Sequence, residues 1–239
     1  MSNATLDQPI MLRLKTSTQA RHDATENGDF NRELVHGRLP LDQYVESIAQ
    51  LFLIHARLES HLRRHQSSLP PIASVVTDYQ FQEPYLRNDL TWFHRRPGEI
   101  QPLKSTANFI AEIDRIAAER PLALLGIHYV FEGSNNGSRH IAKAIRRAYN
   151  LTGLDGTHYL DPYGEDQKPR WQAFKDAMNA QTFTEADIAA IVEAAGKTFD
   201  AVMELHRELA AEPVNKASKP VQESAQPAVS RCPFHNARA

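Results

Sequence analysis

The chain has 239 residues, which is enough for one domain with its own hydrophobic core. Hydrophobic residues make up 41% and charged residues 23%, and a formal net charge of −2 argues against a broad nucleic-acid-binding surface. The single cysteine excludes an internal disulfide and favours a reducing compartment. The first ten residues do not read as a secretory signal, and no window of about 20 residues is continuously apolar. We therefore expect a cytoplasmic protein without a membrane span.

Apolar residues recur at helical spacing along most of the chain, which predicts an all-α fold. The first expected helix covers residues 8–27. This spacing places His22 toward the interior, with Glu26 one turn further along. The expected inward face, at steps of three and four residues, consists of Met11, Leu14, Thr18, His22 and Thr25.

Further helices are expected at residues 40–64, 83–93 and 105–119. Arg120-Pro121 then marks a break, because the residue before a proline disfavours helix. The segment 122–150 has helical periodicity at both ends.

The middle of that segment, residues 132–138, is rich in glycine and small polar residues, and we expect it to bend or loosen the helix. A glycine-containing loop follows at 152–168, and then a helix at 169–180. The last helix, to about residue 211, has a clear start, since Thr184 can cap it and Asp187 occupies the third helical position.

Composition changes at Glu212, from where proline and small polar residues predominate. The chain is therefore predicted to consist of an N-terminal arm at 1–9, one helical domain at 10–211 and a disordered tail at 212–239. The tail contains Cys232-Pro233, which has the chemistry of a thiolate heme contact.

Three groups of residues suggest chemistry in the helical domain. An inward His22 can bind a metal through one ring nitrogen while Glu26 accepts a hydrogen bond from the other. Gly133 and Gly137 allow a flat ligand to approach the backbone closely. A basic rim could orient acidic groups on such a ligand, and its candidates are Lys15, Arg170 and Lys175.

Two stretches together resemble the heme oxygenase family. Residues 14–27, Leu-Lys-Thr-Ser-Thr-Gln-Ala-Arg-His-Asp-Ala-Thr-Glu-Asn, resemble the family's proximal helix. Residues 129–138, Tyr-Val-Phe-Glu-Gly-Ser-Asn-Asn-Gly-Ser, resemble the distal helix in its bacterial form. The resemblance extends over residues 10–211 and implies a single-domain helical bundle of about seven or eight helices around one heme.

The resemblance also implies roles for individual residues. His22 would be the proximal iron ligand and Glu26 its hydrogen-bonding partner, with Lys15 facing a heme propionate. Gly133 and Gly137 would lie over the distal heme face. The remaining expected heme contacts are Tyr129, Ser138, Arg170, Lys175 and, in the tail, Cys232.

The activity that the resemblance implies is oxidative cleavage of heme to biliverdin, carbon monoxide and ferrous iron. Heme would be both substrate and cofactor, and the reaction would need O₂ and electrons from a reductase or ferredoxin.

Two departures from the family pattern affect the distal helix. The second glycine of the usual pair is Ser138, whose side chain could crowd the distal face or donate a hydrogen bond to bound oxygen. Ser134 stands where mammalian forms have an aspartate that orders water. Asn135, Asn136 or Arg139 could order water instead, so Ser134 and Asn136 are expected near the chemistry.

Two other functions stay open on the sequence alone. One is heme binding or sensing without turnover. The other is a non-heme di-iron oxidase on the same fold, built from His55, Glu59, His128 and Glu132. The last helix is a weak source of further metal ligands, since Asp200 and His206 do not share a face.

Overall fold

In the computed structural model, residues 8–211 are described, and this part of the chain contains helices and no strand. The expected all-α fold is confirmed. None of these helices is both long and apolar enough to cross a membrane. The α-helices are α1 (Ile10–Glu26), α2 (Asp29–Val35), α3 (Leu41–Gln66), α4 (Pro70–Val75), α5 (Glu83–Trp92), α6 (Lys104–Glu119), α7 (Leu124–Tyr149), α8 (Gln167–Asn179) and α9 (Glu185–Ala211).

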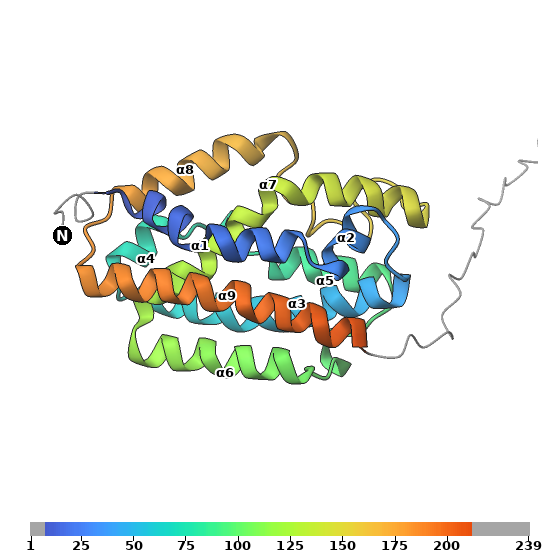
Figure 1. Ribbon diagram of the computed structural model, residues 1–239, viewed down its shortest axis with the longest axis horizontal. Coiled ribbons are helices and arrows are strands. Elements are labelled where there is room, and N and C mark those ends of the chain that lie inside the picture. The colour runs from blue at the N-terminus through green and yellow to red at the C-terminus, as the bar shows by residue number, and fades with distance from the viewer. Residues whose placement is uncertain (1–7, 212–239) are drawn as a thin grey trace, which may run out of the picture.

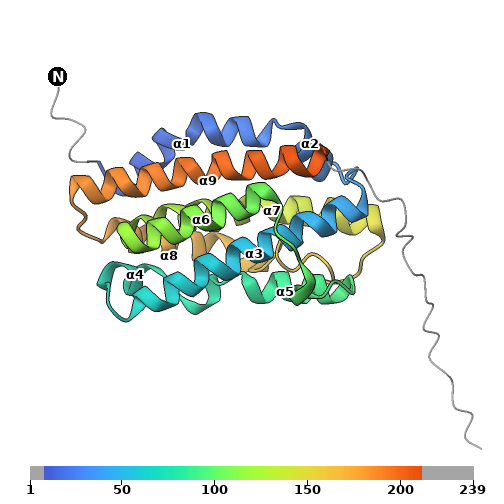
Figure 2. The same ribbon diagram turned by 90° about the horizontal axis from the view of Figure 1, so that it is seen from below.

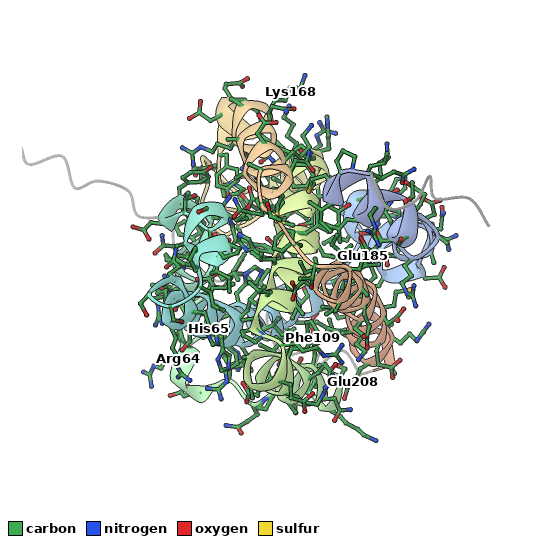
Figure 3. The ribbon with its side chains drawn as sticks, turned by 90° about the vertical axis from the view of Figure 1, so that its left-hand side faces the viewer. Arg64, His65, Phe109, Lys168, Glu185 and Glu208 are labelled. Atoms are coloured by element: carbon green, nitrogen blue, oxygen red, sulfur yellow. The ribbon has the colours of Figure 1, made fainter. Side chains whose placement is uncertain are left out.

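The long helices form a bundle around α7. Helices α1 and α9 lie side by side along one side of the bundle (Figures 1 and 2), and α3 packs against α5 and α6 on another. Seen end-on in Figure 3, α7 runs through the middle, between α8 with Lys168 and α6 with Phe109. One buried core therefore joins the helices, and α7 is covered on several sides.

Local sequence signals located most helices correctly. The start of α9 is a reciprocal cap, in which the Asp187 backbone N–H donates to Thr184 Oγ1 at 3.1 Å and the Thr184 N–H donates to Asp187 Oδ2 at 3.0 Å. The short helices α2 and α4 were missed. Pro70 and Pro71 occupy the first turn of α4, where a missing N–H costs no hydrogen bond.

Residues 132–138 were expected to bend or loosen the helix. They do not interrupt it, because α7 is continuously helical through this segment. Its serines bond to the helix itself: Ser134 Oγ donates to the Phe131 carbonyl at 2.7 Å and Ser138 Oγ to the Ser134 carbonyl at 2.8 Å. Such bonds leave the backbone ladder intact and tend to bend it. Figure 1 shows that α7 changes direction partway along its length.

Small residues hold α7 against its neighbours on either side of this central segment. Near its start, Gly126 lies directly against the backbone of α9 at Ile191. Near its end, Gly37, which has a positive φ of 64°, packs against Ala144 and Ala148. Between these two contacts, the face of α7 that carries Gly137 is uncovered.

Gly126→Ala is expected to destabilise the fold strongly. The added methyl group would overlap the Ile191 carbonyl oxygen, and a backbone carbonyl within a helix cannot move aside as a side chain can. Overpacking of this kind costs about 3 kcal/mol at the upper end of its usual range. Urea unfolding measures the loss. Gly98→Ala is the control, since its new methyl group meets nothing within 4 Å, and equal stabilities of the two variants would contradict the expectation.

Candidate functional site

Helices α1 and α7 approach each other where Thr18 meets Tyr129. Burial raises the pKa of Tyr129, and a hydrogen bond with the Thr18 side chain opposes that shift. Beyond this point both helices run in the same direction (Figure 1). His22, one turn after Thr18, and Gly133, one turn after Tyr129, therefore lie on the same side of the contact. We call His22, Gly133 and Gly137 the α1–α7 site.

His22 does not point into the core as expected, because 47% of its side chain is exposed. The earlier members of the predicted face, Met11, Leu14 and Thr18, are buried, whereas Thr25 is half-buried. The cause is the packing of α1, which contacts α9 and α8 extensively but barely touches α7. The imidazole stands edge-on to Phe199 of α9, with ring centroids 6.0 Å apart. Its exposed part is accessible to a ligand.

Each ring nitrogen of His22 faces a carboxylate. Nδ1 lies 3.4 Å from Asp23 Oδ1, and Nε2 lies 3.5 Å from Glu26 Oε1. Among residues 8–211, these three form the one group of at least three His, Cys, Asp or Glu residues whose ligand atoms lie within 4.8 Å of one another. If one nitrogen binds a metal, the other therefore has an acceptor for its proton in either ring orientation. Sequence reasoning had found Glu26 but missed Asp23, its competitor for this role.

The glycines of α7 leave space on the helix surface. A Cβ atom at Gly137 would meet nothing within 4 Å, and one at Gly133 would first meet the Trp171 indole at 3.4 Å. Ser138 is buried and bonded to the Ser134 carbonyl. The crowding considered for Ser138 therefore does not arise in this conformation, and a flat ligand can approach the backbone at Gly137.

The three residues considered as organisers of water differ in their surroundings. Asn135 is buried and donates from Nδ2 to Glu132 Oε2 at 3.4 Å. Arg139 forms an ion pair with Glu165. Asn136 is exposed, as is Ser134, so these two are the exposed uncharged polar side chains of this segment.

Two of the three predicted basic residues lie near the place where α1 meets α8. There the Met11 backbone N–H donates to Asn179 Oδ1 at 3.2 Å. The two helices run in opposite directions (Figure 1), so Lys15 and Lys175 each lie about one turn from this contact. Neither lysine forms an ion pair within residues 8–211, which leaves both ammonium groups free for an acidic ligand.

Arg170 has a different environment from the two lysines. Its guanidinium lies over the rings of Tyr79, at 4.6 Å, and Tyr163, at 4.7 Å. One of its nitrogens is 3.4 Å from Asp166 Oδ2. The sequence indicated a free cation at this position, whereas the structure shows one stacked on aromatic rings.

The residues of the alternative di-iron site are buried but do not converge. His55 and Glu59 are neighbours on α3, 3.2 Å apart, while His128 contacts Gln80 from α7. The ligand atoms of these three residues and Glu132 do not all lie within 4.8 Å of one another. Among the described residues, the His22 group does meet this criterion. The geometry therefore disfavours a di-iron site here.

Comparison with known proteins identifies the family. The sequence profile described as heme oxygenase matches residues 8–208, which is most of the chain. The chain belongs to the heme oxygenase family. It is 25% identical over 211 residues to the heme oxygenase of Rhodella violacea, a match that covers 85% of this chain and 88% of that relative.

Solved heme oxygenases share the fold. The structure of heme oxygenase-2 from Synechocystis sp. PCC 6803, in complex with heme and NO, superposes with a TM-score of 0.80 at 24% identity and covers 84% of this chain and 85% of that one. Heme oxygenase from Leptospira interrogans gives 0.78 at 21% identity and covers 84% of this chain and all (100%) of that one.

Family membership confirms the predicted fold, heme as the substrate and cofactor, and heme oxygenase as the enzyme class. The roles of individual site residues stay predictions. The described helices end at Ala211. The expected tail at 212–239, with Cys232, lies outside the described residues, as do residues 1–7 of the expected arm.

Replacing the two carboxylates beside His22 separately should identify its hydrogen-bonding partner. Loss of such a partner typically weakens metal affinity or activity by about 10- to 100-fold. Heme titration and turnover measure this loss in Glu26→Gln and in Asp23→Asn. We expect one of the two variants to show it and the other to stay close to wild type. Full activity in both variants and in the double variant would contradict a role for either carboxylate.

Proposed function

We propose that heme lies between α1 and α7, with its iron bound by His22. The observation that carries this proposal is the half-exposed imidazole of His22 on one helix and the uncovered backbone at Gly137 on the other. An imidazole suits iron, and a bare helix surface suits the flat porphyrin. Asp23 or Glu26 accepts the remaining N–H of His22 and so fixes the ring orientation.

The other residues of the site orient the porphyrin. Lys15 and Lys175, both free of ion pairs in the described part of the chain, are placed to hold the propionates as charge-assisted partners. Tyr129 closes the end of the site where α1 meets α7. Ser134 and Asn136 are the polar side chains available to water on the distal helix.

The reaction is oxidative cleavage of heme to biliverdin, carbon monoxide and ferrous iron. Heme iron supplies the redox chemistry, with O₂ as the oxidant and electrons from a separate donor such as a reductase or ferredoxin. The chain itself contributes an axial ligand, an anchor for the propionates and a distal surface with little side-chain bulk. We place this activity in the cytoplasm, because a lone cysteine fits a reducing compartment.

Reconstitution of the full chain with heme tests the proposal. Addition of ferredoxin, ferredoxin reductase, NADPH and O₂ should replace the heme Soret band with biliverdin absorbance and release one carbon monoxide for each heme. Tight heme binding without bilin would instead establish a heme-binding protein without turnover. Two irons bound without porphyrin would overturn the heme assignment. For Cys232, we propose a secondary heme contact through its thiolate, which heme titration of Cys232→Ala tests.

A further inference from the structure

A buried carboxylic acid lies directly beside the distal segment of α7. Glu132 precedes Gly133 and is only 1% exposed. Its Oε2 accepts a hydrogen bond from the Tyr163 hydroxyl at 2.9 Å and a longer one from Asn135 at 3.4 Å. Its Oε1 is buried without a hydrogen-bond partner within the described residues. A buried carboxylate oxygen without a donor is costly, but a proton on that oxygen removes the charge.

Tyr163 is in turn held from two other parts of the chain. Gln82, just before α5, donates from Nε2 to the Tyr163 hydroxyl oxygen at 2.8 Å. Because this bond occupies the oxygen as an acceptor, the hydroxyl proton is free to point at Glu132. Arg170 of α8 covers the Tyr163 ring, which also packs edge-on against Tyr79. Tyr163 therefore connects the centre of α7 to α5 and α8.

Burial, and not the polar groups around it, favours the neutral form of Glu132. Burial raises its pKa to about 7, opposed by the Tyr163 hydrogen bond, the Arg170 charge and Asn135. Tyr163 is neutral, since burial and the neighbouring Glu132 raise its pKa well above its ordinary value. His128, one turn earlier on α7, is neutral as well, because burial lowers its pKa to about 3.

Other titratable groups of this region are Tyr85 of α5, Tyr159, which lies 3.4 Å from His55 Nε2, and the α3 residues Glu59 and His55. Glu59 Oε1 accepts hydrogen bonds from the backbone N–H groups of Gln82 and Glu83 at 2.6 and 2.9 Å. His55 lies 3.2 Å from the same oxygen, and Arg63 lies 3.9 Å from Glu59 Oε2. Glu59 Oε1 is thus anchored by the start of α5, whereas Glu59 Oε2 has no hydrogen-bond partner within the described residues and faces Arg63. Glu132 is the buried acid that lies on α7 itself.

We infer that protonated Glu132 and Tyr163 are positioning residues that hold the distal segment of α7, residues 133–138, in place beneath the bound heme. The heme part of this inference rests on the proposed function. The holding contact itself does not, because it is present in the protein without heme. In this proposal Glu132 and Tyr163 act by holding α7, and neither residue contacts heme.

Hydrogen exchange of the heme-free full chain tests the holding contact. Tyr163→Phe keeps the ring against Arg170 and removes the bond to Glu132. We expect the amides of residues 133–138 to exchange roughly tenfold faster, as for the loss of one buried hydrogen bond to an acid. Tyr79→Phe is the matched control, since its ring also packs on Arg170 but its hydroxyl makes no hydrogen bond in the described part of the chain. Equal exchange in both variants, or faster exchange spread evenly over α3 and α6, would overturn the inference.

Glu132→Gln tests the role of the proton. The glutamine keeps an acceptor for Tyr163 but cannot ionise. A carboxyl whose pKa rises from 4.5 to about 7 on folding stabilises the fold below pH 4.5, and this contribution is lost as the pH rises through 7. Wild type should therefore lose stability relative to Glu132→Gln over this range. Asp89, also raised to about 7, is present in both proteins and cancels. Parallel pH profiles would refute the neutral acid.

The heme-loaded protein links the contact to the proposed function. Tyr163→Phe should lower kcat and shift the pH midpoint of the ferric heme spectrum, with heme affinity unchanged. Glu132→Gln, which imitates the neutral acid, should keep both properties near their wild-type values below pH 7. Loss of affinity with unchanged kcat would contradict a positioning role. If the wild-type chain fails to bind heme, the proposed function fails, and the exchange experiment still decides whether Glu132 and Tyr163 hold α7.

Discussion

His22→Ala is expected to lose the absorbance signature of histidine-ligated heme and to lower turnover by more than about 100-fold. Loss of a hydrogen-bonding partner of a metal ligand already costs about 10- to 100-fold, so loss of the ligand itself should cost more. The protein should still fold, because His22 is 47% exposed and contributes little to the core. The Soret band of the ferric complex and bilin formation are the two measurements.

His36→Ala is the control for this experiment. His36 is also exposed, and within residues 8–211 its ring bonds only to the Arg32 carbonyl, at 2.7 Å, in its own helix end. The control should behave as wild type. An unaltered Soret band together with full activity in His22→Ala would disprove the axial assignment and direct attention to another histidine.

Gly137→Leu is expected to weaken heme binding by at least about tenfold, or about 1.4 kcal/mol, while leaving the fold intact or slightly stabilised. The space around a Cβ atom at Gly137 is empty to 4 Å, so a side chain can begin there without a clash in the heme-free protein. Replacing a mid-helix glycine also favours the helix by about 0.8 kcal/mol. The leucine would, however, occupy the surface that the porphyrin needs.

Gly98→Leu provides the comparison, since Gly98 is equally open but lies outside the α1–α7 site. Thermal unfolding and heme titration of both variants separate binding from stability. A Gly137→Leu protein that binds heme as tightly as wild type would show that the porphyrin does not lie against this part of α7. A Gly137→Leu protein that unfolds at a much lower temperature would show that the site is closed in solution.

Much of the fold could be predicted because its signals are local. Helical periodicity located α3 and α7, and the Thr184–Asp187 cap fixed the start of α9. The continuity of α7 could not be foreseen from propensity, because glycine and serine lower helix propensity wherever they occur. Serine hydroxyls bonded to the helix backbone and packing against other helices determine the outcome there.

The site could be predicted in part. His22, Gly133 and Gly137 follow from spacing and family resemblance, but their partners come from distant segments. Phe199 lies beside His22, and Trp171 lies beside Gly133. Both partners are distant in the sequence, so no local sequence pattern indicates these contacts. In the same way, the sequence shows that Arg170 is a cation but not that Tyr79 and Tyr163 lie beneath it.

Two backbone contacts, at Gly126 and beside Ala144, fix α7 near both of its ends. The span of α7 between these contacts can bend without breaking either of them, so bending would adjust the width of the proposed heme site. That span contains Gly133 and Gly137, the residues that stiffen a helix least. The flexibility of this span would then determine how quickly heme enters and how quickly the opened tetrapyrrole product leaves.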